Sequence, residues 1–307
     1  MFRKVSLKTI LLLFAALLIL VIITTLIDHK KGNRSFKNIL VEFNADQIDK
    51  IEIYPKVMQG KKVELNKEND RWMLTEGGKK FNADLKMTGS LINELNGIRP
   101  ASVASNKKER WNEYLVNDSL GTHVRLFSGN NLQADLYLGK FSFSGQSGKS
   151  YIRLAGENTT YSVDGFQASG FNRDTNGFKD KTVIHSSKED WGKLTFSYPA
   201  DSSFILEKHD DHWQVTGMDT DSAKVAGFLG TLSEVSHYKL SKNEPTGSPL
   251  FSLTIEGTNL ASPVEVKGYQ QADQFLVSSS QNPGVYFEGD DLKGKLFPPR
   301  SKFGGKR

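Results

Sequence analysis

The chain contains two similar halves, and this duplication limits the folds that it can adopt. Residues 63–74 match residues 204–215, with one tryptophan at the same place in each stretch. The pattern of residues 84–95 recurs over residues 221–232. Because a tandem duplication is the simplest explanation, each half should form a similar set of elements.

Each half combines strand patterns with one helical pattern. Ile48, Ile51 and Ile53 are separated by polar residues, which is typical of a strand with one buried face. Leu85 to Leu95 has apolar residues at helical spacing, and Asp84 precedes it as a candidate N-cap. Each half therefore predicts an antiparallel sheet with a covering helix, an α+β arrangement.

The first 30 residues contain the most apolar stretch of the chain. An unbroken apolar run from Ile10 to Ile23 lies inside Leu7 to Ile27, which is about the length that a helix needs to cross a bilayer. No small-x-small cleavage site follows, so an uncleaved anchor is favoured over a cleaved signal peptide or a buried soluble helix. The predicted fold class is α+β, with a single N-terminal transmembrane helix followed by two tandem repeats.

The net charge of +5 is concentrated at the N-terminus. Residues 1–37 contain seven Lys or Arg side chains and one Asp, so the rest of the chain is slightly acidic. A nucleic-acid-binding protein needs a basic face on its folded part, and none is indicated. The membrane lipid bilayer is the expected partner of the basic flank. The absence of cysteine excludes thiolate zinc sites and lipidated-cysteine anchors.

Basic residues lie on both sides of the apolar run, so charge alone does not decide its orientation. A tail of only a few residues favours a cytoplasmic N-terminus. We therefore expect the bulk of the chain to lie outside the cytoplasm, anchored in the inner membrane. The expected division is 1–37 for tail, anchor and basic flank, 38–165 for the first repeat, 166–190 for a packed joint, 191–299 for the second repeat and 300–307 for a basic tail.

Motifs for catalysis, cofactors or metals are not evident. His209 and His212 flank two aspartates, but the repeat places them in a hairpin turn. A calcium loop starting at Asp174 would need a glutamate at its twelfth position, where His185 stands. Neither a phosphate-binding loop nor a G-x-S-x-G elbow occurs. We therefore predict no enzymatic activity, no cofactor and no metal.

The joint between the repeats is polar and rich in glycine but carries three phenylalanines. A flexible linker would not hold so many large apolar groups, so this joint should pack on one or both repeats. Trp111 lies in a short helical stretch that the second repeat lacks, which favours an interface. The candidate partner-binding residues are Trp111, Phe166, Phe171, Asn172, Arg173, Phe178, Asp180 and Lys181.

Several motifs resemble a known family. They are Trp111-x-x-Tyr114, Asp118-Ser119-x-Gly121-Thr122, Leu138-Gly139-Lys140, Tyr161 to Phe166, and Phe171-Asn172-Arg173. They are similar to DUF4340, a domain-of-unknown-function family of membrane-anchored bacterial proteins, over residues 45–185 and more loosely in the second repeat. The resemblance implies an accessory component beside ABC-transporter subunits of the gliding-motility type, and no catalytic residues.

The leading hypothesis is a non-enzymatic, single-pass membrane protein whose extracytoplasmic domain binds a partner. That partner is expected to be an ABC-transporter permease or another envelope component. The alternative is an unrecognised or degenerate envelope hydrolase with Asp174, Asp180 and His185 at its site. A purely structural spacer is a third interpretation.

Overall fold

The computed structural model describes residue 14 and residues 16–19, 36–144, 147–210, 212–271 and 273–305. The predicted transmembrane stretch, Leu7 to Ile27, therefore lies almost entirely outside the described residues. Among the residues that are described, no helix is both long enough and apolar enough to cross a membrane.

Strands dominate the described part of the chain. Eighteen strands form antiparallel sheets of nine, seven and two strands. The two longest helices, α2 (Leu85–Leu95) and α5 (Ser222–Leu232), have 11 residues each. The predicted α+β class with a transmembrane helix is therefore wrong, and the chain is mostly β. The reason is that several stretches expected as turns or joints pair as strands, and one expected strand continues to 14 residues.

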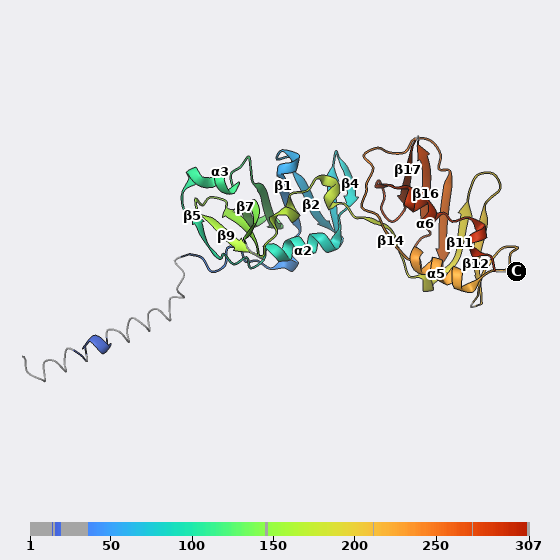
Figure 1. The fold of residues 1–307 in the computed structure, drawn as a ribbon, viewed down its shortest axis with the longest axis horizontal. Helices are drawn as coiled ribbons and strands as arrows, with labels where there is room; N and C mark the ends of the chain where they lie inside the picture. The colour runs from blue at the N-terminus through green and yellow to red at the C-terminus, as the bar shows by residue number, and fades with distance from the viewer. Residues whose placement is uncertain are drawn as a thin grey trace, which may run out of the picture.

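The nine-stranded sheet occupies the first half of the chain (Figure 1). Its strand order is β4-β3-β2-β1-β6-β7-β8-β9-β5. The strands are β1 (Lys50–Tyr54), β2 (Val63–Glu68), β3 (Arg71–Glu76), β4 (Lys79–Asn82), β5 (Ser102–Ser105), β6 (Thr122–Ser128), β7 (Asn131–Ser144), β8 (Ser147–Leu154) and β9 (Thr160–Asp164). We call residues 36–181 the first unit.

The seven-stranded sheet follows the same plan. Its order, β13-β12-β11-β15-β16-β17-β18, corresponds strand by strand to β3-β2-β1-β6-β7-β8-β9. The strands are β11 (Trp191–Ser197), β12 (Phe204–His209), β13 (His212–Val215), β15 (Phe251–Gly257), β16 (Val264–Gln271), β17 (Gln274–Ser279) and β18 (Tyr286–Glu288). We call residues 182–305 the second unit, which also contains the pair β10 (Thr182–His185) and β14 (Glu234–Ser236).

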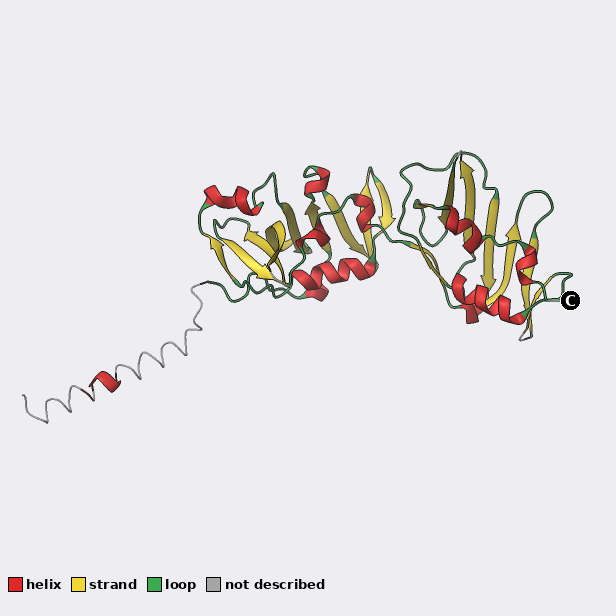
Figure 2. Ribbon diagram, viewed as in Figure 1, coloured by secondary structure: helices red, strands yellow, loops and turns green. Residues whose placement is uncertain are grey.

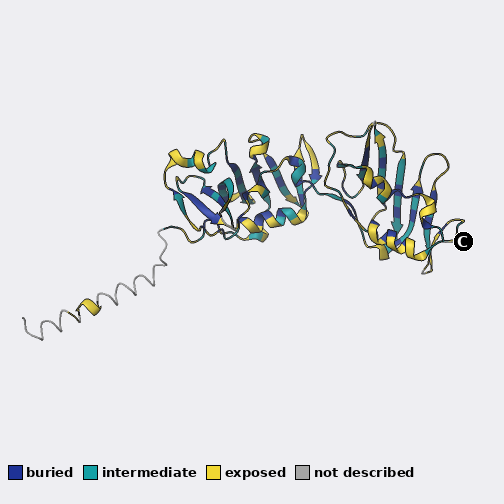
Figure 3. Cartoon of the chain, viewed as in Figure 1, coloured by how far each residue is buried: buried dark blue, intermediate teal, exposed yellow. Residues whose placement is uncertain are grey.

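Each sheet has one long helix lying along it (Figure 2). Asp84 and Asp221 cap α2 and α5 by accepting hydrogen bonds from backbone N–H groups of the first turn. The inward-facing residues of both helices are buried in the core, whereas their outer faces are exposed (Figure 3). These buried residues are Thr88, Leu91, Ile92 and Leu95 in α2, and Val225, Phe228, Leu229 and Leu232 in α5. The shorter helices are α3 (Trp111–Tyr114), α4 (Thr175–Phe178) and α6 (Asp290–Leu296).

A phenylalanine near the end of each unit closes its core. The backbone N–H of Asp84 donates to the carbonyl oxygen of Phe178 over 3.0 Å, and that of Asp221 donates to Phe303 over 2.9 Å. Both phenylalanine side chains are fully buried. The joint thus ends the first unit in the way that α6 and the turn Arg300–Phe303 end the second.

The two units follow one another along the molecule, with the β4 edge of the first facing the β17 and β18 end of the second (Figure 1). Asn82 donates from Nδ2 to the carbonyl oxygen of Gln281 over 3.2 Å. Asn282 donates from Nδ2 to the carbonyl oxygen of Asp180 over 2.9 Å. Lys79 and Glu244 form an exposed ion pair across the same contact.

We predict that Phe303→Ala lowers the free energy of unfolding by about 3–5 kcal/mol, because it leaves a cavity where a fully buried ring packs on α5. Urea unfolding followed by tryptophan fluorescence measures this change. Phe143→Ala is the matched control, since the Phe143 side chain is 77% exposed and should change stability by less than about 0.5 kcal/mol. Equal effects of the two substitutions would contradict a closing role for Phe303.

Candidate functional site

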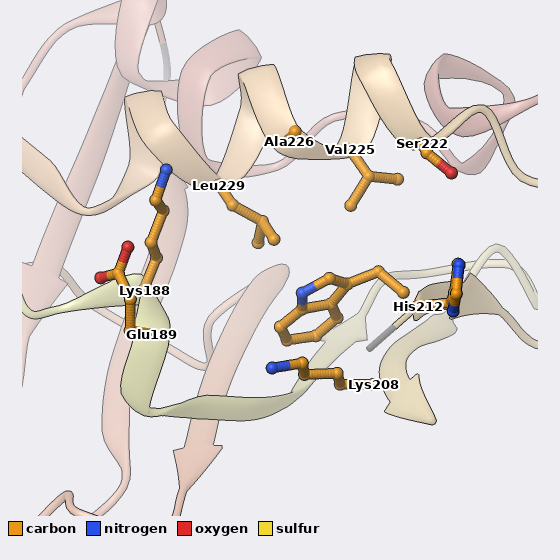
Figure 4. A pocket seen from close by; sticks show the side chains of 9 residues that line it. Lys188, Glu189, Lys208, His212, Ser222, Val225, Ala226 and Leu229 are labelled. Carbon is orange, nitrogen blue, oxygen red and sulfur yellow. The ribbon is translucent and has the colours of Figure 1, made fainter. Parts of the chain in front are cut away.

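A groove opens between α5 and β13 in the second unit. Its cavity has a volume of about 350 Å³. Figure 4 shows Val225 and Leu229 pointing from α5 into this space, with Lys188 and Glu189 near one end and His212 near the other. We call this cavity the Trp213 groove. Its lining residues are Lys188, Glu189, Lys208, His212, Trp213, Ser222, Val225, Ala226 and Leu229.

The groove exists because the sheet of the second unit ends at β13. In the first unit, β4 continues the sheet beyond β3 and pairs Phe81 with Leu74. The corresponding tryptophan, Trp72, is only 6% exposed, and the turn 260–264 of the second unit lies on the other side of the cleft that it lines. Trp213 is half-buried, since no such strand or neighbouring unit covers it within the described residues.

The rim of the groove carries more positive than negative charge. Lys188 and Lys208 line it together with a single carboxylate, Glu189. The hydroxyl of Ser187 donates to that carboxylate over 2.7 Å and lowers the pKa of Glu189, so Glu189 is ionised at neutral pH. An apolar floor with a net positive rim favours an apolar segment flanked by acidic residues.

The matching positions of Trp72 and Trp213 in the two repeats predict a core residue at both, yet only Trp72 is buried. The signal that separates the two was in the spacing. The helix cap Asp84 follows Trp72 by 12 positions, whereas Asp221 follows Trp213 by 8. The missing residues correspond to β4, the strand that completes the edge of the first sheet.

The first unit carries a charged network on the face of its sheet away from α2. Glu52 lies between Ile51 and Ile53 on β1 and so projects to the opposite face. It accepts from Lys50 over 2.9 Å and from Arg125 over 3.0 Å. Burial alone would raise the pKa of Glu52, but the hydrogen bond from Lys50 and the nearby cations outweigh it, so the pKa is lowered. Glu52 is therefore a buried anion held by its partners.

A row of stacked side chains crosses the same face. The ring of His123 lies 5.3 Å from Tyr54 and 4.3 Å from Tyr137. The guanidinium group of Arg153 lies 4.1 Å from the ring of Tyr137 and 3.9 Å from that of Trp111. Arg153 is buried, and its Nε atom donates to the backbone carbonyl oxygen of Val116 over 2.9 Å. The contact of Arg153 with the Trp111 ring holds α3 against the sheet, so Trp111 has a structural role.

His123 and Asp135 form a close pair within this row, with Nε2 and Oδ1 2.6 Å apart. A histidine paired with an aspartate is also a component of hydrolytic sites. Here both ring faces are stacked, and within the described residues no hydroxyl group is hydrogen-bonded to His123. The pair therefore serves packing of the sheet face.

The predicted partner-binding residues do not form one site. Phe166, Phe171 and Phe178 are buried in the core of the first unit, so their rings are not offered at the surface. Arg173 is exposed. Asn172 is half-buried, and its Oδ1 atom accepts from the backbone N–H of Val57 over 2.9 Å.

The remaining predicted residues make local contacts. Trp111 donates from Nε1 to the carbonyl oxygen of Asn158 over 2.9 Å. Asp180 accepts from the backbone and hydroxyl groups of Thr182. Lys181 donates to backbone carbonyls of the joint, and its burial lowers its pKa despite the surrounding aspartates.

The hydrolase alternative requires Asp174, Asp180 and His185 to act together, but these residues make different local contacts. Asp174 caps α4 by accepting from the backbone N–H of Gly177 over 2.9 Å. Asp180 and His185 line a cleft between the two units. No hydrogen bond joins any two of these three residues in the described part of the chain, where no group of three or more His, Asp or Glu residues is placed to hold a metal ion either.

A comparison with family models supports the resemblance noted in the sequence. The model described as "Domain of unknown function (DUF4340)" matches residues 72–246, which is more than half of the chain. The match begins at β3 and ends after β14, so it includes parts of both units. No curated protein and no solved structure matches the chain.

We predict that Glu52→Gln lowers the free energy of unfolding at pH 7 by about 1–3 kcal/mol, because it weakens charged hydrogen bonds from Lys50 and Arg125. Because the folded pKa of Glu52 lies below 4.5, its stabilisation is present above pH 4.5 and is lost as the pH falls through the folded value. The difference between the two proteins should therefore shrink below pH 4.5. Urea titrations from pH 3 to pH 7 measure it, with the exposed Glu109→Gln as control. A difference that grows on acidification would refute this assignment.

Proposed function

Since this chain belongs to the DUF4340 family, whose function is unknown, we propose from its own features that it is a non-enzymatic binding protein. Its apolar N-terminal stretch holds it at the inner membrane, and the two sheet units lie outside the cytoplasm. The second unit docks a partner protein in the Trp213 groove. The partner is an ABC-transporter permease or another envelope protein.

The observation that carries this proposal is the difference between the two tryptophans. In the first unit, Trp72 is only 6% exposed, and β4 extends the sheet beyond its strand. In the second unit, no strand of the described residues extends the sheet beyond β13, and the Trp213 groove is open. The first unit therefore provides an example of the occupant, which is a protein segment with a buried apolar residue such as Phe81 of β4.

A second copy of this chain is a poorer occupant than another protein. Stacking in series would place the turns at 129–132 and 155–159 of one chain on the groove of the next. In the first unit these turns already have contacts, since Trp111 donates to Asn158 and Lys37 pairs with Glu157. The far edge of that sheet is also extended by β5 on β9. The row of two units is thus covered by β5 at its N-terminal end and has the open Trp213 groove at its other end.

Membrane attachment is supported by sequence and by the direction of the chain. The apolar run precedes the first unit, and the basic residues around it suit anionic lipid head groups. The strand order places β13 at the end of the molecule away from residue 36 (Figure 1). The Trp213 groove therefore lies at the end of the described chain that is distant from residue 36.

We expect a photo-reactive p-benzoylphenylalanine at Ser222, in the full chain in intact cells, to crosslink to one envelope protein. The same group at Ala223, which is exposed on α5 but does not line the groove, should give little of that adduct. Mass spectrometry identifies the adduct. The absence of a Ser222-specific adduct would remove the basis for partner docking.

Binding of the identified partner to the purified full chain then tests the groove directly. Ala226→Trp fills the groove and should weaken binding at least about tenfold. Ala223→Trp adds the same bulk on the same helix outside the groove and should leave the affinity unchanged. Equal affinities of both variants and the original protein would place the interface elsewhere.

A further inference from the structure

A second cavity lies between the two units. It is larger than the Trp213 groove, with a volume of about 600 Å³. We call it the inter-unit cleft. Trp72 and Leu85 line it from the first unit, whereas Pro263 and Pro283 line it from the second. Pockets at the boundary between folded units, with apolar walls and a few converging polar groups, are common ligand sites.

The polar groups of the cleft come from both units and from the joint. Asp70 and Arg71 lie on the turn and strand beside Trp72, and Asn82 ends β4. Asp180 and His185 line the cleft from the joint and β10. The lining includes two carboxylates, one guanidinium group and no lysine, so it is not suited to a phosphate or another strong anion.

We propose that the inter-unit cleft binds a neutral oligosaccharide. Planar carboxylate, amide and guanidinium groups can each pair with adjacent hydroxyl groups of a sugar, because they offer two acceptors or two donors in one plane. The exposed rings of Pro263 and Pro283 supply apolar surface for the C–H face of a sugar ring.

An extended peptide fits this cleft less well. Strand addition would need an unpaired sheet edge, and each edge next to the cleft is already bridged by another segment of the chain at one point. The segment at Leu240 bridges to Phe287 on β18. At the end of β4, the carbonyl oxygen of Asn82 accepts from the backbone N–H of Asp180 over 2.8 Å.

Buried Asn282 adds a polar group beside the cleft. It stands between the lining residues Gln281 and Pro283 and donates to backbone carbonyls of Asp180 and Thr182. Its Oδ1 atom is buried and has no hydrogen-bond partner among the described residues.

A ligand in the cleft would hold the two units together. Direct contacts across it are few and include the hydrogen bond from Asn82 to the carbonyl of Gln281. A sugar bonded to Arg71 on one side and packed on Pro263 on the other would add contacts that depend on the present inter-unit angle. Oligosaccharide binding therefore couples to the relative orientation of the units.

Isothermal titration of the full chain, in a detergent without a sugar head group, tests this proposal with the neutral sugars maltotriose, cellotriose and N,N′,N″-triacetylchitotriose. At least one of them should bind with a dissociation constant below about 1 mM. Arg71→Ala removes a lining donor, and Ala261→Trp fills the cleft, so each should weaken binding at least about tenfold. His212→Ala changes the counterpart of Arg71 in the second unit and should leave sugar binding unaltered.

Binding that is lost in both cleft variants and kept in His212→Ala supports the proposal. No binding of any of the three sugars would overturn it, as would binding that neither cleft variant weakens. The result is independent of partner docking, because Ala226→Trp blocks the Trp213 groove and should not change sugar affinity. Loss of sugar binding in that variant would instead place the sugar in the groove.

Discussion

The hydrogen bond between the cap of each long helix and a distant phenylalanine carbonyl is the constraint on which both units depend. Asp84 and Asp221 each accept from the first turn of their helix and donate their own N–H to Phe178 or Phe303. The helix start, the end of the unit and the buried phenylalanine ring are therefore fixed together. In the first unit this closure also brings the chain to β10, so it sets the position of the second unit and of the inter-unit cleft.

The two units share a strand order but differ in what covers their ends. The first unit has β4 on one edge and α3 stacked on its outer face through Arg153. It also carries the buried Glu52 network, where the second unit has Thr195 and Thr254 facing each other. The second unit lacks β4, and the Trp213 groove results. The two units thus share one scaffold, and the differences between them create the candidate binding surfaces.

Short-range sequence patterns predicted those strands and helices that are determined by residues close together in the chain. The alternation ending at Tyr54 is β1, and the helical pattern after Asp84 is α2 with its predicted cap. The fold class was wrong because short strands such as β10 and β14 are stabilised by pairing between residues about 50 positions apart, which no local period reveals. The same holds for the joint. Its phenylalanines indicated packing, but only the tertiary contact with Asp84 shows that they complete the first unit.

The position of the closing phenylalanine has a consequence for synthesis. Each unit is completed by a residue that lies after all of its strands, so neither core can be sealed while its own strands are still being made. Phe178, however, precedes the whole of β11 to β18, so the first unit can close before the second exists. Folding in order from the N-terminus would keep corresponding strands of the two copies from pairing with each other, which is a hazard of any tandem duplication.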